Sequence, residues 1–364
     1  MTGDYPPHGG NLSWAADRYG LQPGDFLDFS SNVNPLGPPP RAVEAARRAL
    51  EDVHRYPEPD ARSLKSALSD FLGVEEEQIM LGNGSTELIH HLCRCKGPHR
   101  VTVVTPAFSE YERAARIAGA LVYHYQLRPD DGFYLDREGL AEAAAGSDLT
   151  FFCNPASPSG HLYDRRELLP ALQACRESGG VMVVDESYMG FCRAPEAEQA
   201  TLLPEVGKGN LVIISTLTKL FALAGLRGPG WLATDAVTVS RWEEAAFPWR
   251  VNAAAMVAGS SALADSGYIM RTQELVSEWR GALHRGLEDT GFFKVYPSSA
   301  NFLLLRIFHS TRDASDLADA LGYRGLLIRN CADFAGLDSR FARVAVHSPG
   351  RSNRLIEAIR EVWV

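Results

Sequence analysis

The sequence has no apolar run that approaches the roughly 20 residues needed to cross a bilayer, so we expect no membrane-spanning helix. Residues 1–7 lack the basic segment and apolar core of a signal peptide. The chain also lacks an excess of positive charge, since its formal net charge is -9. That charge argues against nucleic-acid binding, which depends on basic surfaces. We therefore expect a cytoplasmic protein with neither a membrane nor a nucleic-acid partner.

Cysteine is scarce and scattered, with six residues in a chain of 364. Without a secretory segment, these cysteines are expected to be reduced thiols. Cys93 and Cys95 lie two positions apart in an expected helix and therefore point in different directions. The sequence thus predicts no metal site.

The length of the chain allows one large domain and a smaller one. We expect an N-terminal arm over residues 1–40, a large domain over 41–250, a connecting helix over 251–279 and a small α/β domain over 280–364. The arm is rich in Gly, Pro and Asn and cannot bury much surface by itself. It should therefore lie across a larger domain or a partner subunit.

Strand and helix patterns alternate through the expected large domain. The apolar segments that read as strands are 79–81, 101–105, 122–126, 149–153, 181–184 and 211–215. Continuous apolar strands separated by helices indicate a mostly parallel sheet that is covered on both faces. Ligands of such sheets bind beyond the carboxyl ends of the strands.

Polar and aromatic residues follow several of these strands and are expected to share one pocket. They are Phe108, Asn154, Asp185, Tyr188 and Lys219, with Arg227 as a second cation in the next loop. A lysine amine in a dry, phosphate-bearing site can form a Schiff base with an aldehyde cofactor. Considered alone, Lys219 is better explained as a surface lysine, and the neighbouring motifs reverse that interpretation.

The segment Gly82-Asn83-Gly84-Ser85-Thr86-Glu87 joins an expected strand to an expected helix. Glycines and small hydroxyls at a helix N-terminus present backbone N–H groups and the positive end of the helix dipole, which suits a phosphate. No Gly-Lys-Ser/Thr follows, so the segment is not a Walker loop. By itself it is explained more simply as a capped helix.

Taken in order, these motifs resemble those of pyridoxal-phosphate enzymes with the aspartate-aminotransferase fold, in the branch that holds histidinol-phosphate aminotransferase and threonine-phosphate decarboxylase. The resemblance covers nearly the whole chain. It implies an α/β fold with a mostly parallel seven-stranded sheet in the large domain and a small α/β C-terminal domain. It also implies that Lys219 binds the aldehyde of pyridoxal 5'-phosphate and that Asp185 pairs with the pyridinium nitrogen.

The resemblance assigns further contacts to the cofactor. Asn154 and Tyr188 would bind the ring oxygen, Phe108 would stack on the ring, and Gly84, Ser85, Thr216, Thr218 and Arg227 would surround the phosphate. Tyr56 would reach the cofactor phosphate of a neighbouring subunit, which implies a homodimer with shared active sites.

Three segments strengthen the resemblance to threonine-phosphate decarboxylase, namely residues 8–11, 28–37 and 327–346. In this likeness Arg343 would bind the substrate carboxylate, and Arg329, His8 and Asn32 would bind a substrate phosphate. Arginine suits both tasks because its planar fork binds oxyanions through two hydrogen bonds. The implied activity is decarboxylation of an O-phospho-amino acid, L-threonine O-3-phosphate or an analogue such as phosphoserine, in cobalamin biosynthesis.

The chain departs from the family pattern on the substrate side. The departures are Ala156, Ser157 and Ser159 in the loop after Asn154, Ser187 in place of alanine, the Gly228-Pro229 stretch, and His347 where a permanent cation is common. Tyr188 is typical of aminotransferases. Three alternatives stay open: an aminotransferase of the histidinol-phosphate type, a related enzyme of natural-product biosynthesis, and a cofactor-binding protein without catalysis.

Overall fold

A seven-stranded sheet lies at the centre of the larger part of the chain in the computed structural model, which describes residues 5–363. Its strand order is β2-β8-β7-β6-β5-β3-β4. The strands are β2 (Ile79–Gly82), β3 (Arg100–Thr105), β4 (Leu121–Gln126), β5 (Leu149–Cys153), β6 (Val181–Asp185), β7 (Leu211–Thr216) and β8 (Gly230–Ala233). Strands β3 to β7 pair in parallel, whereas β8 is antiparallel to both of its neighbours. The predicted mostly parallel sheet is therefore confirmed.

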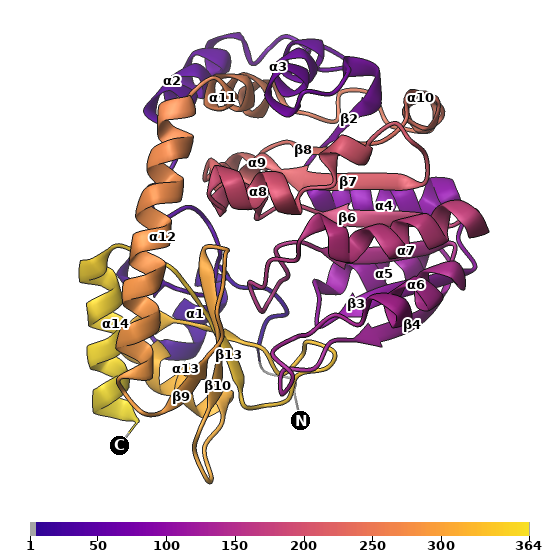
Figure 1. The fold of residues 1–364 in the computed structure, drawn as a ribbon. Helices are drawn as coiled ribbons and strands as arrows, with labels where there is room; N and C mark the ends of the chain where they lie inside the picture. Colours follow the sequence, from indigo (N-terminus) through magenta and orange to yellow (C-terminus); the bar gives the residue numbers. More distant parts are fainter. Residues whose placement is uncertain (1–4, 364) are drawn as a thin grey trace.

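Helices cover both faces of this sheet (Figure 1). Helices α4 (Ser85–Lys96) and α5 (Ser109–Ile117) pack on one face, and α6 (Arg137–Ala145) and α7 (Arg165–Ser178) pack on the other. In β5, Phe151 packs with the first pair of helices and Phe152 with the second. Burial of alternate side chains in two cores explains why the central strands are apolar at nearly every position. The shorter helices α8 (Ala194–Ala200), α9 (Leu217–Leu220) and α10 (Ala236–Glu244) complete this part of the chain.

The C-terminal part contains a second sheet with the strand order β12-β13-β10-β9. Its strands are β9 (Phe293–Val295), β10 (Phe302–Ile307), β12 (Arg329–Asn330) and β13 (Phe341–Ala345). Helices α13 (Ala314–Gly322) and α14 (Pro349–Val362) belong to this part, and α14 runs beside α12 (Ser266–Glu288) (Figure 1). The N-terminal segment joins it through α1 (Leu12–Tyr19) and β1 (Leu27–Asp28), because β1 pairs in parallel with β11 (Leu326–Leu327).

The predicted single connecting helix is two helices in the structure. Helix α11 (Ala253–Leu263) packs against α2 (Pro40–Ala49) and α3 (Arg62–Leu72), whereas α12 runs down to the C-terminal part (Figure 1). The break occurs because Asp265 caps a new helix by accepting from the Tyr268 backbone N–H at 3.0 Å. The sequence analysis also missed β8 and β9, which are four and three residues long.

Among residues 5–363, no helix is both long and apolar enough to cross a bilayer. In the same range, no cluster of His, Cys, Asp and Glu side chains is arranged to hold a metal ion.

Candidate active site

A cavity of about 440 Å³ lies at the carboxyl ends of the central strands, where the N-terminal segment and the C-terminal part meet the large sheet. This volume is typical of a site for a small ligand. The predicted site residues that line it are His8, Asn32, Gly84, Ser85, Phe108, Asp185, Tyr188, Thr216, Thr218, Lys219, Arg227, Arg329 and Arg343. Asn154 and Tyr56 do not line it.

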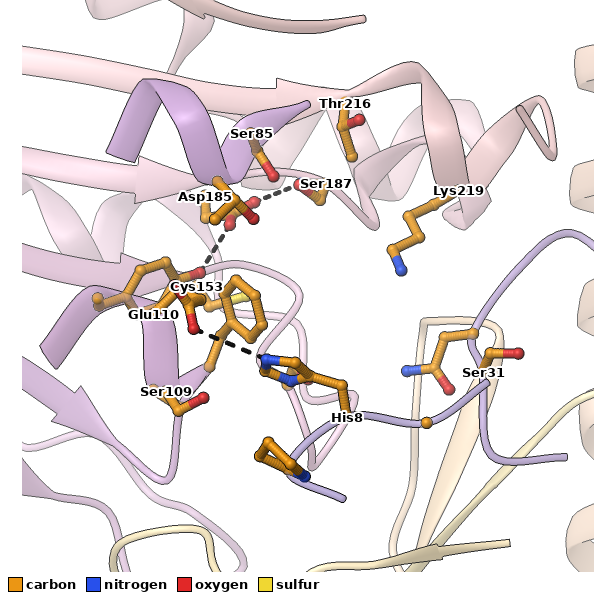
Figure 2. Close-up of a pocket in the computed structure, with 18 of the residues that line it drawn as sticks. His8, Ser31, Ser85, Ser109, Glu110, Cys153, Asp185, Ser187, Thr216 and Lys219 are labelled. Atoms are coloured by element: carbon orange, nitrogen blue, oxygen red, sulfur yellow. Dashed lines mark hydrogen bonds and ion pairs between the residues drawn. The ribbon is translucent and has the colours of Figure 1, made fainter. Parts of the chain in front are cut away.

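Lys219 is held at the cavity by the short helix that follows β7. Strand β7 is buried along its whole length and ends at Thr216. The Thr216 side chain then caps α9 by accepting from the Thr218 backbone N–H at 3.2 Å. Figure 2 shows that the Lys219 side chain extends from this helix into the cavity. The strand end and the cap together fix the place of the amine.

Asp185 is the last residue of β6 and is 6% exposed. Its carboxylate accepts from the Tyr111 hydroxyl at 2.7 Å and from the Ser187 backbone N–H at 2.9 Å (Figure 2). Burial raises the pKa of Asp185, while these hydrogen bonds and the charge of Lys219 oppose the rise. A buried carboxylate of this kind is stabilised by a further cation, such as a protonated ring nitrogen.

A narrow cradle lies at the N-terminus of α4. Gly84 precedes the helix with φ +81°, and a Cβ atom there would come within 3.0 Å of the Arg227 guanidinium. Gly230 of β8 passes even closer, because a Cβ atom at Gly230 would lie 2.3 Å from the Gly84 carbonyl carbon. The first turn of α4 leaves backbone N–H groups without helical partners. These N–H groups and Arg227 together suit an anion such as a phosphate.

Phe108 and Tyr188 supply the aromatic surfaces of the cavity. Phe108 is the N-cap residue that precedes α5, and its ring centroid lies 5.7 Å from that of Tyr111, with the two ring planes at 86°. Tyr188 packs edge-on against Phe302, with ring centroids 4.9 Å apart. Next to them, the buried Oγ of Ser187 has no hydrogen-bond partner among the described residues. An unsatisfied donor in this wall is available to a bound molecule.

Asn154 is not among the residues that line the cavity, and its contact with the cofactor ring oxygen stays a prediction. It is fully buried, its Nδ2 donates to the Tyr163 carbonyl at 2.9 Å, and its Oδ1 accepts from the Tyr163 N–H at 3.0 Å. Both ends of the carboxamide therefore hold the loop that follows β5, and Asn154 stays outside the cavity. Ser157 lines the cavity instead, and its Oγ accepts from Arg343 Nη1 at 3.1 Å. The sequence signal for Ser157 was its departure from the family pattern.

Tyr56 lies outside the cavity of its own chain. It is 82% exposed, and its ring centroid lies 4.7 Å from that of Trp249. A single chain does not test whether Tyr56 reaches a neighbouring subunit, so that role stays a prediction.

Arg343 of β13 is a buried cation without an acidic partner among the described residues. It is 8% exposed, and its guanidinium carbon lies 5.1 Å from the centre of the Phe302 ring. With its carboxamide oxygen facing the guanidinium, Asn32 accepts from Nη1 at 3.1 Å and from Nε at 3.3 Å. Burial lowers the pKa of Arg343 because the charged form loses hydration. Such a cation is stabilised by an anionic ligand in the cavity.

Arg329 of β12 has a different environment. Its Nη2 lies 2.6 Å from the Asp333 carboxylate and donates to the Pro7 carbonyl at 2.7 Å. The sequence analysis did not foresee Asp333 at this position. Asn32 therefore sits beside Arg343, whereas Arg329 is paired with an acid and with the N-terminal segment.

His8 reaches the opposite wall of the cavity. Its Nε2 lies 3.7 Å from the Glu110 carboxylate (Figure 2), and its ring centroid lies 5.5 Å from that of Phe108. Burial alone would raise the pKa of Glu110, but hydrogen bonds from His90 and Arg113 outweigh it and hold this pKa below its usual value. Glu110 is the second acid that sequence reasoning missed at this end of the cavity.

Two departures from the family pattern lie just outside the cavity lining. The Pro229 carbonyl accepts from the Leu217 N–H at 2.9 Å, so the Gly228-Pro229 stretch supports the helix that carries Lys219. His347 contacts the Asp28 carbonyl through Nε2 at 2.9 Å, and burial lowers its pKa. His347 is therefore a neutral contact to the N-terminal segment.

These residues fit a phosphate-bearing aldehyde cofactor with an aromatic ring. Lys219 offers the amine, Asp185 a buried carboxylate, Phe108 a flat wall, and the Gly84–Arg227 cradle an anion site. An α/β fold with these residues around its cavity is typical of enzymes that bind such an aldehyde cofactor through a lysine. Residues 24–359 match the family described as Aminotransferase class I and II. The chain belongs to this family, and its cofactor is pyridoxal 5'-phosphate.

The chain is similar to two kinds of enzyme within the family. It is 34% identical to the threonine-phosphate decarboxylase of Salmonella typhimurium over 98% of this chain and 96% of that protein. It is 36% identical to a histidinol-phosphate aminotransferase of Symbiobacterium thermophilum, over 92% and 90% of the two chains. Among solved structures, the histidinol-phosphate aminotransferase of Clostridium acetobutylicum has a TM-score of 0.85 at 27% identity and covers 92% of this chain and 98% of its own.

Proposed function

We propose that the protein is a lyase that decarboxylates an O-phospho-amino acid, with L-threonine O-3-phosphate as the first candidate and aminopropanol phosphate as its product. One observation carries the proposal: two buried arginines, Arg343 and Arg329, line the cavity that Lys219 enters. Two guanidinium groups suit a substrate that bears both a carboxylate and a phosphate. The similarity to threonine-phosphate decarboxylase supports the same substrate. Phosphoserine is the nearest alternative of the same class.

Each side chain has a role in this proposal. When bound, pyridoxal 5'-phosphate supplies an electron sink for the bond that breaks at the substrate Cα. Asp185 would hold the protonated ring nitrogen, Lys219 would hold the cofactor aldehyde, and the Lys219 amine would donate a proton to the substrate Cα in place of the departing carboxylate. Arg343 orients the substrate carboxylate with the help of Asn32. Arg329 and His8 bind the substrate phosphate.

An aminotransferase of the histidinol-phosphate type is the second candidate, because a relative with that activity is 36% identical to the chain. A transaminase needs a keto acid for its second half-reaction, whereas the lyase needs none. The test is therefore to mix the holoenzyme with O-phospho-L-threonine in the absence of any keto acid. Carbon dioxide released over many turnovers, with aminopropanol phosphate in equal amount, is the expected result. Glutamate formed only with added 2-oxoglutarate, without carbon dioxide, would identify the aminotransferase.

The proposal includes a homodimer in which Tyr56 reaches the cofactor phosphate of the neighbouring subunit. An aromatic residue that is 82% exposed in one chain is well placed for an interface. A cytoplasmic location and a step in cobalamin biosynthesis belong to the same proposal. Analytical ultracentrifugation of the holoenzyme tests the dimer, and a monomer at micromolar concentration would contradict it.

A further inference from the structure

The two arginines of the cavity differ in what they already bind. Among residues 5–363, Arg343 forms hydrogen bonds to neutral groups, namely Ser157, Asn32 and the Ser30 carbonyl, and has no acidic partner. Arg329 forms an ion pair with Asp333, at 2.6 Å, and its side chain is 6% exposed. Only one of the two cations is therefore ready to accept an anion without first giving one up.

Asp333 is held much less firmly than Arg329. Its side chain is 40% exposed, and Arg329 is the one partner that its carboxylate has among the described residues. Arg329, in contrast, also donates to the Pro7 and Asn330 carbonyls. If the pair breaks, Asp333 can turn toward water while Arg329 stays in place. The carboxylate therefore occupies the arginine in the way that a weakly bound ligand would.

We propose that Asp333 sets the affinity of the cavity for anions by competing with the distal anion of the substrate for Arg329. The inference rests on the proposed function, since it takes Arg329 as the site of the substrate phosphate. An intramolecular carboxylate acts at a high effective concentration. It lowers the affinity of every anion that needs Arg329 by a common factor. A phosphate, with more charge and more acceptor oxygens, still binds at useful concentrations, whereas a second carboxylate falls below them.

This competition has a consequence for the choice of reaction. A dicarboxylic keto acid is the usual partner in a second half-reaction and would place its distal carboxylate on the same arginine. Because Asp333 already supplies a carboxylate to Arg329, binding of such an acid only exchanges one carboxylate for another. Asp333 thus weakens both kinds of ligand alike, which leaves a tightly binding phosphorylated substrate able to bind and keeps the weaker co-substrate of a transaminase below a useful affinity.

The test uses three ligands that lack an amine and therefore do not react with the cofactor. They are 4-phosphonobutyrate, glutarate and butyrate, which share one carboxylate and differ in the distal group. Dissociation constants for the holoenzyme are measured by titration calorimetry. Asp333→Asn should tighten 4-phosphonobutyrate and glutarate by a similar factor, about two- to fivefold for a partly exposed ion pair, and leave butyrate unchanged.

Matched variants separate competition from a general effect of charge. Asp333→Glu keeps a carboxylate and should bind all three ligands like the original protein. Asp130→Asn removes another acid that pairs with an arginine, Arg306, and lies outside the cavity lining; it should change none of the three constants. Arg329→Gln should abolish the preference for 4-phosphonobutyrate over butyrate.

Two results would overturn the inference. One is an Asp333→Asn protein whose affinities for 4-phosphonobutyrate and glutarate are unchanged. The other is an equal gain for butyrate, which has no distal anion. Binding is measured without turnover, so either result leaves the carbon dioxide assay free to decide the proposed function. A failed carbon dioxide assay likewise leaves the binding series interpretable.

Discussion

Replacing Arg343 by methionine should separate stability from activity. Methionine is long and apolar and fills much of the space of the arginine stem. Its introduction removes a buried cation that lacks an acidic partner among the described residues, together with hydrogen bonds to Ser157 and Asn32. Losing those bonds costs about 1 kcal/mol each, and removing the desolvated charge offsets that cost. The free energy of unfolding should therefore change by no more than about 1 kcal/mol.

Catalysis, unlike stability, should respond strongly to this substitution. Truncating one partner of a buried charge pair with the substrate carboxylate costs about 2–5 kcal/mol, which corresponds to a roughly 30- to 5000-fold loss of kcat/KM. The assay measures kcat/KM for O-phospho-L-threonine beside thermal unfolding of the holoenzyme. Arg340→Met, at an exposed position just before β13, is the control and should change neither quantity. An Arg343→Met enzyme with unaltered kcat/KM would refute the role of Arg343 in substrate binding.

Four further predictions concern the cofactor, the dimer and one buried acid, Glu186. Lys219→Ala should lose turnover and the visible absorbance of the bound cofactor while its far-ultraviolet circular dichroism is retained. Gly230→Ala should weaken cofactor retention in equilibrium dialysis, because the new Cβ would lie 2.3 Å from the backbone of Gly84. Tyr56→Ala should leave the unfolding temperature of the apoprotein within a few degrees but speed cofactor loss; an unaltered rate of loss would argue against its reaching a phosphate. Burial raises the pKa of Glu186 to about 7, so the folded protein favours the protonated form of this carboxyl. The stability that this preference contributes is fully present below the pKa of Glu186 in the unfolded chain, and it is lost as the pH rises through 7. Glu186→Gln should therefore remove about 2 kcal/mol of the stability difference between pH 5 and pH 7, as measured by denaturant unfolding.

The larger sheet could be predicted because its strands carry a strong local signal. Residues 211–214 are all apolar, the whole strand is buried, and polar residues of the cavity come at or directly after the ends of such strands. Strand β8 escaped notice because it is only four residues long and begins at Gly230, directly after the Gly228-Pro229 stretch, a composition typical of a turn. The break before α12 was also missed, since Asp265 acts as a cap only through its contact with the Tyr268 N–H.

The cofactor side of the cavity was easier to predict than the substrate side. Lys219 and Asp185 owe their places to strand ends, which sequence order defines. Asn154 also follows a strand, but its carboxamide binds the backbone of Tyr163, a contact that sequence order does not reveal. The pairing of Arg329 with Asp333 depends on the path of the loop after β12 and became visible only in three dimensions.

The role of Lys219 is tested most directly by finding which lysine holds the cofactor. The holoenzyme is reduced with borohydride, digested and analysed by mass spectrometry. We expect one phosphopyridoxyl group per chain, on the peptide that contains Lys219. A label on another lysine, or no label on an enzyme that retains its cofactor, would contradict that role.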